Sequence, residues 1–325
     1  FDYKVNYPVG RVEYLVLRPV SFTEFLEAIG EQTAIEQMEN IPFNNFAHEK
    51  LMNLFHTYAL MGGMPEIIKY YSENKELTGL KNIYESLITS YLDDVEKYAM
   101  NSTRANILRH AIRSCFTEAG KRIKFQGFGN SNYRSREIGE ALKTLEQTLL
   151  INLIYPTTAQ DLPMIPNKEK SPRLQILDTG LLNYFAGIQQ DIIQTDDLNS
   201  IYKGTVIEHL VGQELLSTKY NALSSLNFWV RDKNSSSAEI DFLIPYKNKL
   251  IPIEVKSGKE GTLKSLHLFM NDAPHNIAIR LYSGSFGISE IETKTGKNFK
   301  LINLPYFLTS QVEKYIGFAE NSKVS

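Results

Sequence analysis

The sequence predicts a multidomain protein of the α and α/β classes, with a helical first part, a winged helix-turn-helix block, and a final α/β domain built on a central mixed sheet. The chain has 325 residues, and at roughly 100 to 200 residues per domain that length favours two or three domains. Stripes of helical period dominate its first half, whereas β-branched and aromatic runs separated by polar turns dominate the second. Between them, from about residue 156 to residue 172, a stretch rich in Pro, Thr, Lys and Asp indicates a linker or exposed loop.

The composition is that of an ordinary globular protein, with 42% hydrophobic and 22% charged residues. It excludes disordered and collagen-like classes. No run approaches the ~20 apolar residues that cross a bilayer, so no membrane partner is expected. Cys115 is the only cysteine, which excludes an intrachain disulfide and is typical of a reducing compartment. A chain that begins with Phe1 and carries no signal peptide predicts a cytoplasmic location and a missing upstream part.

The net charge of −2 hides an asymmetry along the chain. Residues 1–103 hold 8 Lys and Arg against 15 Asp and Glu, a net charge of −7. Residues 104–148 hold 9 against 4, a net charge of +5. A basic block of this kind favours a nucleic-acid partner. The alternative is a solvated basic surface.

The helical first part, predicted over 1–95, begins with a clear start signal. Ser21 and Glu24 have the spacing of a capping box, in which each side chain bonds a free backbone N–H of the other residue. Gly30 is placed to end that helix. Two glycines and a proline predict a sharp turn over Met61–Pro65. Apolar residues at helical spacing mark the helices: Phe22, Phe25, Leu26 and Ile29; Leu51, Leu54, Phe55 and Tyr58; Tyr84, Leu87, Ile88, Tyr91 and Leu92.

The block over 96–160 has the pattern of a winged helix-turn-helix domain. A helix containing Ile107, Leu108, Ala111 and Ile112 is followed by a Gly- and Asn-rich connection. Ser135 is then predicted to cap a second helix with Ile138, Leu142 and Leu145 on one face, and the segment Ile151–Pro156 can form the wing strand. Basic residues at the start of a recognition helix reach DNA in such domains; the alternative is a helical connector whose arginines face water. The predicted DNA-binding residues are Arg134, Arg136, Lys121, Arg122 and Lys124.

The α/β domain is predicted over 166–325. An amphipathic helix over Lys203–Lys219 precedes runs that are rich in β-branched and aromatic residues. A further helix carries Leu263, Leu266 and Phe269. This order of helix, strands, helix and strand indicates an α/β fold. The predicted strands are Phe228–Val230, Ile240–Ile244, Leu250–Val255 and His275–Tyr282.

Charged residues on two of these strands indicate a site that binds a divalent cation. Strand alternation puts Glu254 and Lys256 on one face. If the two strands form a hairpin closed by the turn at Tyr246–Lys249, Asp241 converges with Glu254 across it. Facing carboxylates suit Mg²⁺ or Mn²⁺, and a nearby lysine can orient water or neutralise a transition state. The alternative is the charged outer face of an ordinary hairpin.

Asp241, followed 13 residues later by Glu254 and then by Lys256, resembles the PD-(D/E)xK nuclease superfamily. The resemblance implies that Asp241 and Glu254 bind the metal, that Lys256 assists the attacking water, and that Glu208 on the preceding helix completes the metal site. Ile240 stands where that superfamily often has proline. The resemblance is compatible with an active site and equally with a nuclease fold whose chemistry has decayed.

A wider resemblance covers nearly the whole chain. The segments Val9-Gly10-Arg11-Val12-Glu13, Leu17–Phe25 and Gly62-Gly63-Met64-Pro65-Glu66 resemble the later part of a bacterial and archaeal AAA+-type P-loop ATPase family that ends in a nuclease-like domain of unknown function. That family binds ATP, yet no G-x-x-x-x-G-K-[ST] occurs in this chain. The resemblance therefore implies ATP binding in the full-length protein only. Arg11 is a candidate nucleotide-sensing residue, and a surface salt bridge explains it equally well.

Two hypotheses about function follow. The first is the carboxy-terminal portion of an ATP-dependent, DNA-associated ATPase, in which the nuclease-like domain hydrolyses phosphodiesters or only binds DNA. The second is a non-catalytic docking module with a decayed nuclease fold that binds a protein partner, DNA or another copy of the chain. The six histidines lack zinc spacing, so no zinc site is expected.

Overall fold

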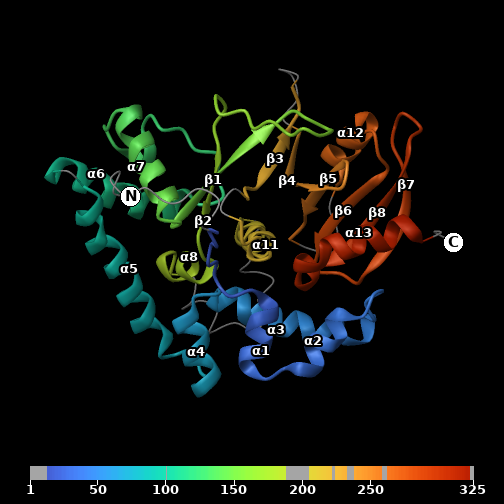
Figure 1. Cartoon of the computed structure of the whole chain (residues 1–325), viewed down its shortest axis with the longest axis horizontal. Helices are drawn as coiled ribbons and strands as arrows, with labels where there is room; N and C mark the ends of the chain where they lie inside the picture. Colours follow the sequence, from blue (N-terminus) through green and yellow to red (C-terminus); the bar gives the residue numbers. More distant parts are fainter. Residues whose placement is uncertain are drawn as a thin grey trace.

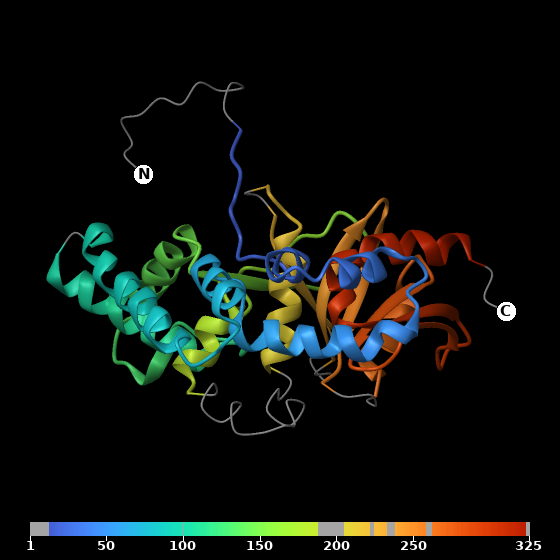
Figure 2. The ribbon, with the colours of Figure 1, turned by 90° about the horizontal axis from the view of Figure 1, so that it is seen from below.

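The computed structural model combines helices with one large sheet, as expected from the sequence. It describes residues 13–99, 101–187, 205–221, 224–232, 238–257 and 262–322. These residues contain 11 α-helices and one eight-stranded mixed sheet. Helices α5 to α7 lie at one end of the molecule and the C-terminal third of the chain lies at the other (Figures 1 and 2). No helix among the described residues is long and apolar enough to span a membrane.

The first part of the described chain is helical, as predicted. The Ser21 side chain accepts from the Glu24 N–H, and the Ser21 N–H donates to the Glu24 carboxylate at 2.7 Å, so the predicted capping box is confirmed. Gly30 ends this helix in the left-handed conformation, also as predicted. The elements are α1 (Phe22–Ile29), α2 (Gln32–Glu39), η1 (Asn45–Ala47), α3 (His48–Met61), α4 (Pro65–Asn74) and α5 (Leu80–Tyr98).

The middle block contains two helices and two strands: α6 (Ser102–Glu118), η2 (Phe128–Asn130), α7 (Ser135–Gln147), β1 (Ile151–Thr157) and β2 (Arg173–Ile176). The prediction that Ser135 caps α7 is wrong by one residue. Ser135 is the first helical residue and Arg134 is the N-cap, with its backbone N–H donating to the Glu137 carboxylate at 2.8 Å. A glutamate three residues after the N-cap therefore satisfies the free donor, in place of the expected serine hydroxyl.

The rest of the chain supplies the remaining strands and the helices that cover them. The predicted strands and both predicted helices are present. The short helix α8, the strands β2, β7 and β8, and the terminal helix α13 were not predicted. The elements are α8 (Thr179–Phe185), α11 (Thr205–Ser217), β3 (Asn227–Val230), β4 (Glu239–Tyr246), β5 (Lys249–Val255), α12 (Lys264–Asp272), β6 (Ile277–Tyr282), β7 (Gly287–Glu292), β8 (Asn298–Pro305), η3 (Tyr306–Gln311) and α13 (Val312–Asn321).

The eight strands have the order β2-β1-β3-β4-β5-β6-β8-β7. β4 and β5 form the predicted antiparallel hairpin, with Tyr246 paired to Lys249 across the turn. β5, β6 and β8 run parallel, whereas β7 returns antiparallel to β8. β1 pairs antiparallel with β2 through its first half and parallel with β3 through its second half. The middle block and the α/β part therefore share one sheet.

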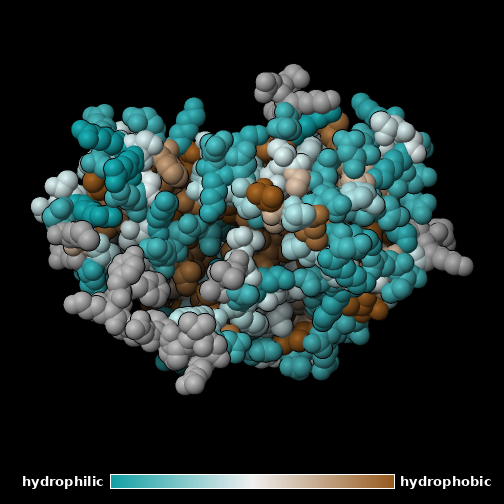
Figure 3. Space-filling model, turned by 45° about the horizontal axis from the view of Figure 1, so that its top comes forward, coloured by the Kyte–Doolittle hydropathy of each residue, from teal (hydrophilic) through white to brown (hydrophobic). Residues whose placement is uncertain are grey.

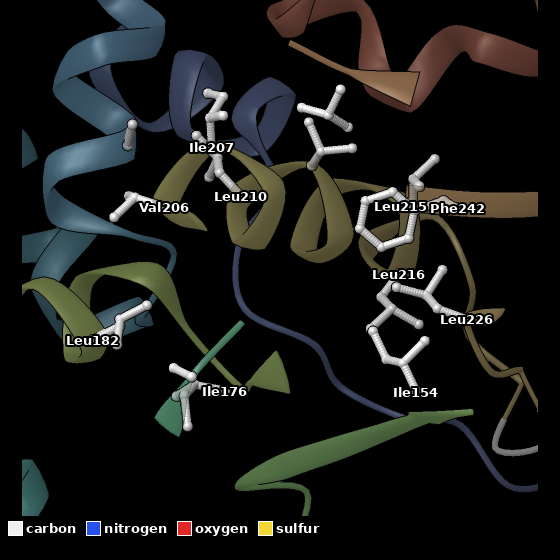
Figure 4. Packing of buried hydrophobic residues seen from close by; sticks show 14 of the residues in the cluster. Ile154, Ile176, Leu182, Val206, Ile207, Leu210, Leu215, Leu216, Leu226 and Phe242 are labelled. Carbon is white, nitrogen blue, oxygen red and sulfur yellow. The ribbon is translucent and has the colours of Figure 1, made fainter. Parts of the chain in front are cut away.

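Two hydrophobic clusters lie on the two sides of this sheet. The larger one extends from Phe22 to Ala319 and joins the helices to the sheet face that carries Phe242 and Ile253. Helix α11 lies at its centre and contributes Leu210, which is fully buried, among residues of β1, β2 and α8 (Figure 4). The smaller cluster packs α12 on the opposite face through Leu266 and Phe269. Because α11 is buried between elements from distant parts of the chain, it fixes the position of the side chains at its start.

Candidate functional site

Asp241 of β4 lies beside β5, as the predicted hairpin requires. Its Oδ2 accepts a hydrogen bond from the backbone N–H of Val255 at 2.8 Å, which orients the carboxylate toward the end of β5. Continuing the register of Phe242 with Ile253 places Asp241 opposite Glu254. The predicted juxtaposition of these two carboxylates is therefore present.

Glu254 and Lys256 of β5 point the same way and contact each other. The Lys256 Nζ donates to Glu254 Oε1 at 2.6 Å. The Glu254 side chain is only 8% exposed, and its second carboxylate oxygen, Oε2, is buried without a hydrogen-bond partner among the described residues. A buried carboxylate oxygen without a donor is costly, so this oxygen is suited to a ligand.

Glu208 stands in the first turn of α11 and extends the acidic group. Burial raises the pKa of Glu208 to about 7, and the charge of Asp241 adds to the rise. The helix that carries it is fixed by the large hydrophobic cluster. Glu208, the fourth residue implied by the resemblance, thus lies near enough to Asp241 and Glu254 for their charges to raise its pKa.

Arg173 of β2 is the residue that the sequence analysis missed. Its NH1 lies 3.7 Å from Glu208 Oε2 and 3.7 Å from Asp241 Oδ1. Its NH2 donates to the carboxylate of Glu239. The side chain is 10% exposed. No local signal marks this arginine, because it follows the linker and lies 68 residues before Asp241.

Arg173 is also held by an aromatic ring. Its guanidinium lies 4.8 Å from the centroid of Phe228, and the guanidinium of Arg122 lies 5.5 Å from the same ring. Such cation–π contacts add to the ion pairs. Arg122 NH1 in turn lies 3.6 Å from Glu239 Oε2. Two arginines from the middle block therefore lie against the acidic residues of the α/β part.

Burial controls the protonation of this group. Burial raises the pKa of Glu254 to about 7, with a further rise from the charge of Asp241. Burial also raises the pKa of Asp241, while the Arg173 guanidinium opposes that rise. For Arg173 itself burial acts to lower the pKa, but the carboxylates of Asp241, Glu208 and Glu239 outweigh it and raise the pKa. The pKa values of Glu208 and Glu254, both raised to about 7, hold these two carboxylates close to their point of ionisation at neutral pH.

The donor set fits a hard divalent cation in its chemistry. All candidate ligands are carboxylate oxygens, which Mg²⁺ and Mn²⁺ prefer, and one of them lacks a partner. Within the described part of the chain, however, no three acidic, His or Cys side chains converge closely enough to form a metal site. The Arg173 guanidinium lies among the carboxylates instead.

The predicted DNA-binding residues fall into two groups. Arg134, Lys121 and Lys124 are exposed. Arg136 is also exposed, with 89% of its side chain accessible and its Nε 3.1 Å from Glu140. Arg122 is exposed as well, but its guanidinium pairs with Glu239 of the α/β part. The predicted nucleotide-sensing residue, Arg11, lies outside the described residues.

Comparison with known proteins identifies two family models along the chain. Residues 52–192 match a domain of unknown function (DUF8612). Residues 203–307 match a second domain of unknown function (DUF4143), which contains Glu208, Asp241, Glu254 and Lys256. Arg173 falls in the first match. No curated protein matches the chain.

Proposed function

We propose that the chain is the carboxy-terminal portion of a DNA-associated AAA+-type ATPase whose α/β part is a PD-(D/E)xK-like nuclease domain that hydrolyses phosphodiester bonds with Mg²⁺ or Mn²⁺. The observation that carries the proposal is the convergence of Asp241, Glu254 and Lys256 at the β4–β5 hairpin. The family matched by residues 203–307 is commonly associated with AAA-type ATPases, which supports the ATPase assignment. ATP would bind in the full-length protein only.

The side chains divide the chemistry between them. Asp241 and Glu254 would hold the cation, and Glu208 would join them as a third oxygen donor only after the side chains move, because no three acidic side chains of the described residues converge on one point. A bound divalent cation would stabilise charge on the phosphoryl oxygens and lower the pKa of a water molecule. The Val255 N–H fixes the Asp241 carboxylate through Oδ2. The Lys256 ammonium, held 2.6 Å from Glu254, would orient the attacking water and offset charge in the transition state.

The middle block supports the assignment to DNA. Its elements follow the order of a winged helix: α6, a bridge at Arg122 paired with Arg173, then η2, α7 and the antiparallel pair β1 and β2. In such domains the N-terminal end of the second helix enters the major groove. In this chain that end carries the exposed Arg134 and Arg136.

A second candidate function is a docking module in which the nuclease fold persists without chemistry. The observation that favours it is Arg173, whose guanidinium neutralises Asp241 and Glu208 where a cation would bind. In that case the acidic group is a structural ion-pair network. The partner would be a protein, DNA or a second copy of the chain.

A plasmid nicking assay separates the two candidates. Supercoiled plasmid is incubated with the protein and millimolar Mg²⁺ or Mn²⁺, and the nicked form is measured over time. We expect nicking by the wild type and none by Asp241→Asn. Lys264→Ala, which removes an exposed charge from α12, is the matched control and should nick at the wild-type rate. Equal residual nicking in wild type and Asp241→Asn would favour the docking module.

A further inference from the structure

Arg173 lies where it can oppose the binding of a divalent cation by the proposed metal ligands. Its NH1 is equidistant, at 3.7 Å, from Asp241 Oδ1 and Glu208 Oε2. Both oxygens are proposed ligands of the divalent cation. An Mg²⁺ ion binds carboxylate oxygens at about 2.0–2.1 Å, so an ion between these two oxygens would meet the guanidinium at close range. The two cations therefore compete for the same pair of carboxylates.

Arg173 is well placed to act as this competitor. It comes from β2, outside the β4–β5 hairpin that carries Asp241 and Glu254. Its guanidinium lies over Phe228, 4.8 Å from the ring centroid, within the distance of a cation–π contact. Glu254 Oε2, by contrast, is buried and has no hydrogen-bond partner among the described residues. The guanidinium thus neutralises only part of the acidic group. Glu254 Oε2 is left as a ligand oxygen for the divalent cation.

A phosphodiester is the natural alternative partner for such a guanidinium. Arginine binds phosphate oxygens through two parallel N–H donors, a geometry that lysine cannot provide. When a nucleic-acid strand reaches the hairpin, a phosphate can accept from Arg173 while the divalent cation takes over Asp241 and Glu208. Glu239, which accepts from Arg173 NH2, would keep Arg122 NH1 at 3.6 Å from its second carboxylate oxygen after the exchange. The donor strand, β2, also belongs to the block that carries the exposed arginines of α7.

We propose that Arg173 is an exchangeable counter-cation: it occupies the carboxylates of Asp241 and Glu208 in the absence of nucleic acid, and it moves to a substrate phosphate when the divalent cation binds. This inference rests on the proposed nuclease function. It makes the binding of cation and DNA mutually dependent, because a factor by which duplex DNA tightens cation binding is also the factor by which the cation tightens DNA binding.

The test measures Mn²⁺ affinity from the free-ion electron paramagnetic resonance signal. All proteins carry Lys256→Ala so that a 20-base-pair duplex stays intact. With Arg173 present, we expect weak Mn²⁺ binding that tightens at least tenfold on addition of the duplex. Arg173→Gln should bind Mn²⁺ at least tenfold more tightly without DNA, and the duplex should then add little. Arg113→Gln is the control, since Arg113 is an exposed arginine of α6 that lies outside the predicted DNA-binding residues. It should behave like the protein with Arg173.

The outcomes separate this inference from the function on which it rests. If no variant binds Mn²⁺ with or without duplex, the metal site itself fails, and the inference fails with it. If Mn²⁺ binds equally to the proteins with and without Arg173, the metal site stands and the exchange is wrong. Arg173→Lys keeps a positive charge should the glutamine variant fail to fold. It should retain weak Mn²⁺ binding but respond less to duplex, and a full duplex response in that variant would also overturn the exchange.

Discussion

One carboxylate oxygen of Asp178 accepts the backbone N–H of Gly63 at 2.6 Å, while the other accepts the N–H of Leu181 at 3.0 Å. A single buried side chain therefore caps α8 and fastens it to the turn between α3 and α4. The turn has no room for a larger residue: a Cβ on Gly62 would lie 2.4 Å from the Asp178 carboxylate. This contact joins the helical first part to the segment that leads from β2 into α8.

Gly62→Ala is expected to destabilise the protein by about 2–5 kcal/mol. Gly62 has φ +68° and ψ −164°, a region that is almost restricted to glycine, and the added methyl group would overlap the Asp178 carboxylate. Urea unfolding followed by circular dichroism measures the change. Gly30→Ala is the control, because Gly30 also has a positive φ but open space around it; it should cost about 1 kcal/mol. Equal costs for the two variants would exclude the packing explanation.

Glu214→Gln should remove a pH dependence of stability. Burial raises the pKa of Glu214 to about 7 from 4.5, although its Oε1 accepts from Tyr58 Oη at 2.7 Å and from the Phe22 N–H at 3.0 Å. A raised acid pKa means that the folded state holds the proton more tightly. The stability that this carboxyl group contributes is therefore fully present below pH 4.5 and is lost as the pH rises to about 7.

The measurement is the free energy of unfolding of wild type minus that of Glu214→Gln as a function of pH. This difference should fall by about 3 kcal/mol between pH 4.5 and pH 7, at 1.36 kcal/mol per pKa unit. Glu313→Gln, which replaces a carboxylate that is 49% exposed, controls for the loss of one acidic group. A flat difference for Glu214→Gln would show that its carboxylate ionises normally in the folded protein.

Replacing Arg134 and Arg136 together by alanine should weaken binding to duplex DNA. The Arg136 side chain is 89% exposed, and both residues stand at the start of the proposed recognition helix α7. Losing two phosphate contacts should reduce the slope of log K against log salt by about 2. Fluorescence anisotropy at several salt concentrations measures both quantities.

The double variant Lys264→Ala with Lys294→Ala is the control for net charge, since both lysines are exposed and lie outside the middle block. It should keep the wild-type slope. Unchanged isotherms for the arginine variant would assign that face to solvent.

Lys256→Ala should separate metal binding from cleavage. Because the lysine contacts Glu254 but is not a proposed ligand, millimolar Mn²⁺ should still raise the melting temperature of this variant while plasmid nicking is lost. Asp241→Asn should lose the Mn²⁺-dependent rise as well, and its buried strand neighbours Ile240 and Phe242 are unchanged. The same rise in Asp241→Asn as in wild type would contradict a site shared by Asp241 and Glu254.

Much of the fold follows from local patterns. The capping box at Ser21, the glycine at the end of α1 and the β4–β5 hairpin were predicted because each depends on residues close together in the chain. The predicted cap of α7 was wrong by one residue. Ser135 is a residue type that favours the N-cap, but the Glu137 carboxylate accepts the backbone N–H of Arg134 and makes Arg134 the N-cap. β7 and β8 were not predicted, and the burial of β8 departs from strict alternation because Leu301 and Ile302 are both buried.

The sequence by itself determined the helices and strands that carry a clear local pattern, among them α1, β4 and β5, and which carboxylates meet across the hairpin. Both depend on backbone geometry that repeats over a few residues. Only the tertiary structure decided that β1 joins β3, that Asp178 fastens α8 to the glycine turn, and that Arg173 lies among the carboxylates. Those contacts join residues far apart in the chain. Packing of the whole hydrophobic core selects them, and no periodicity in the sequence records which distant partners it brings together.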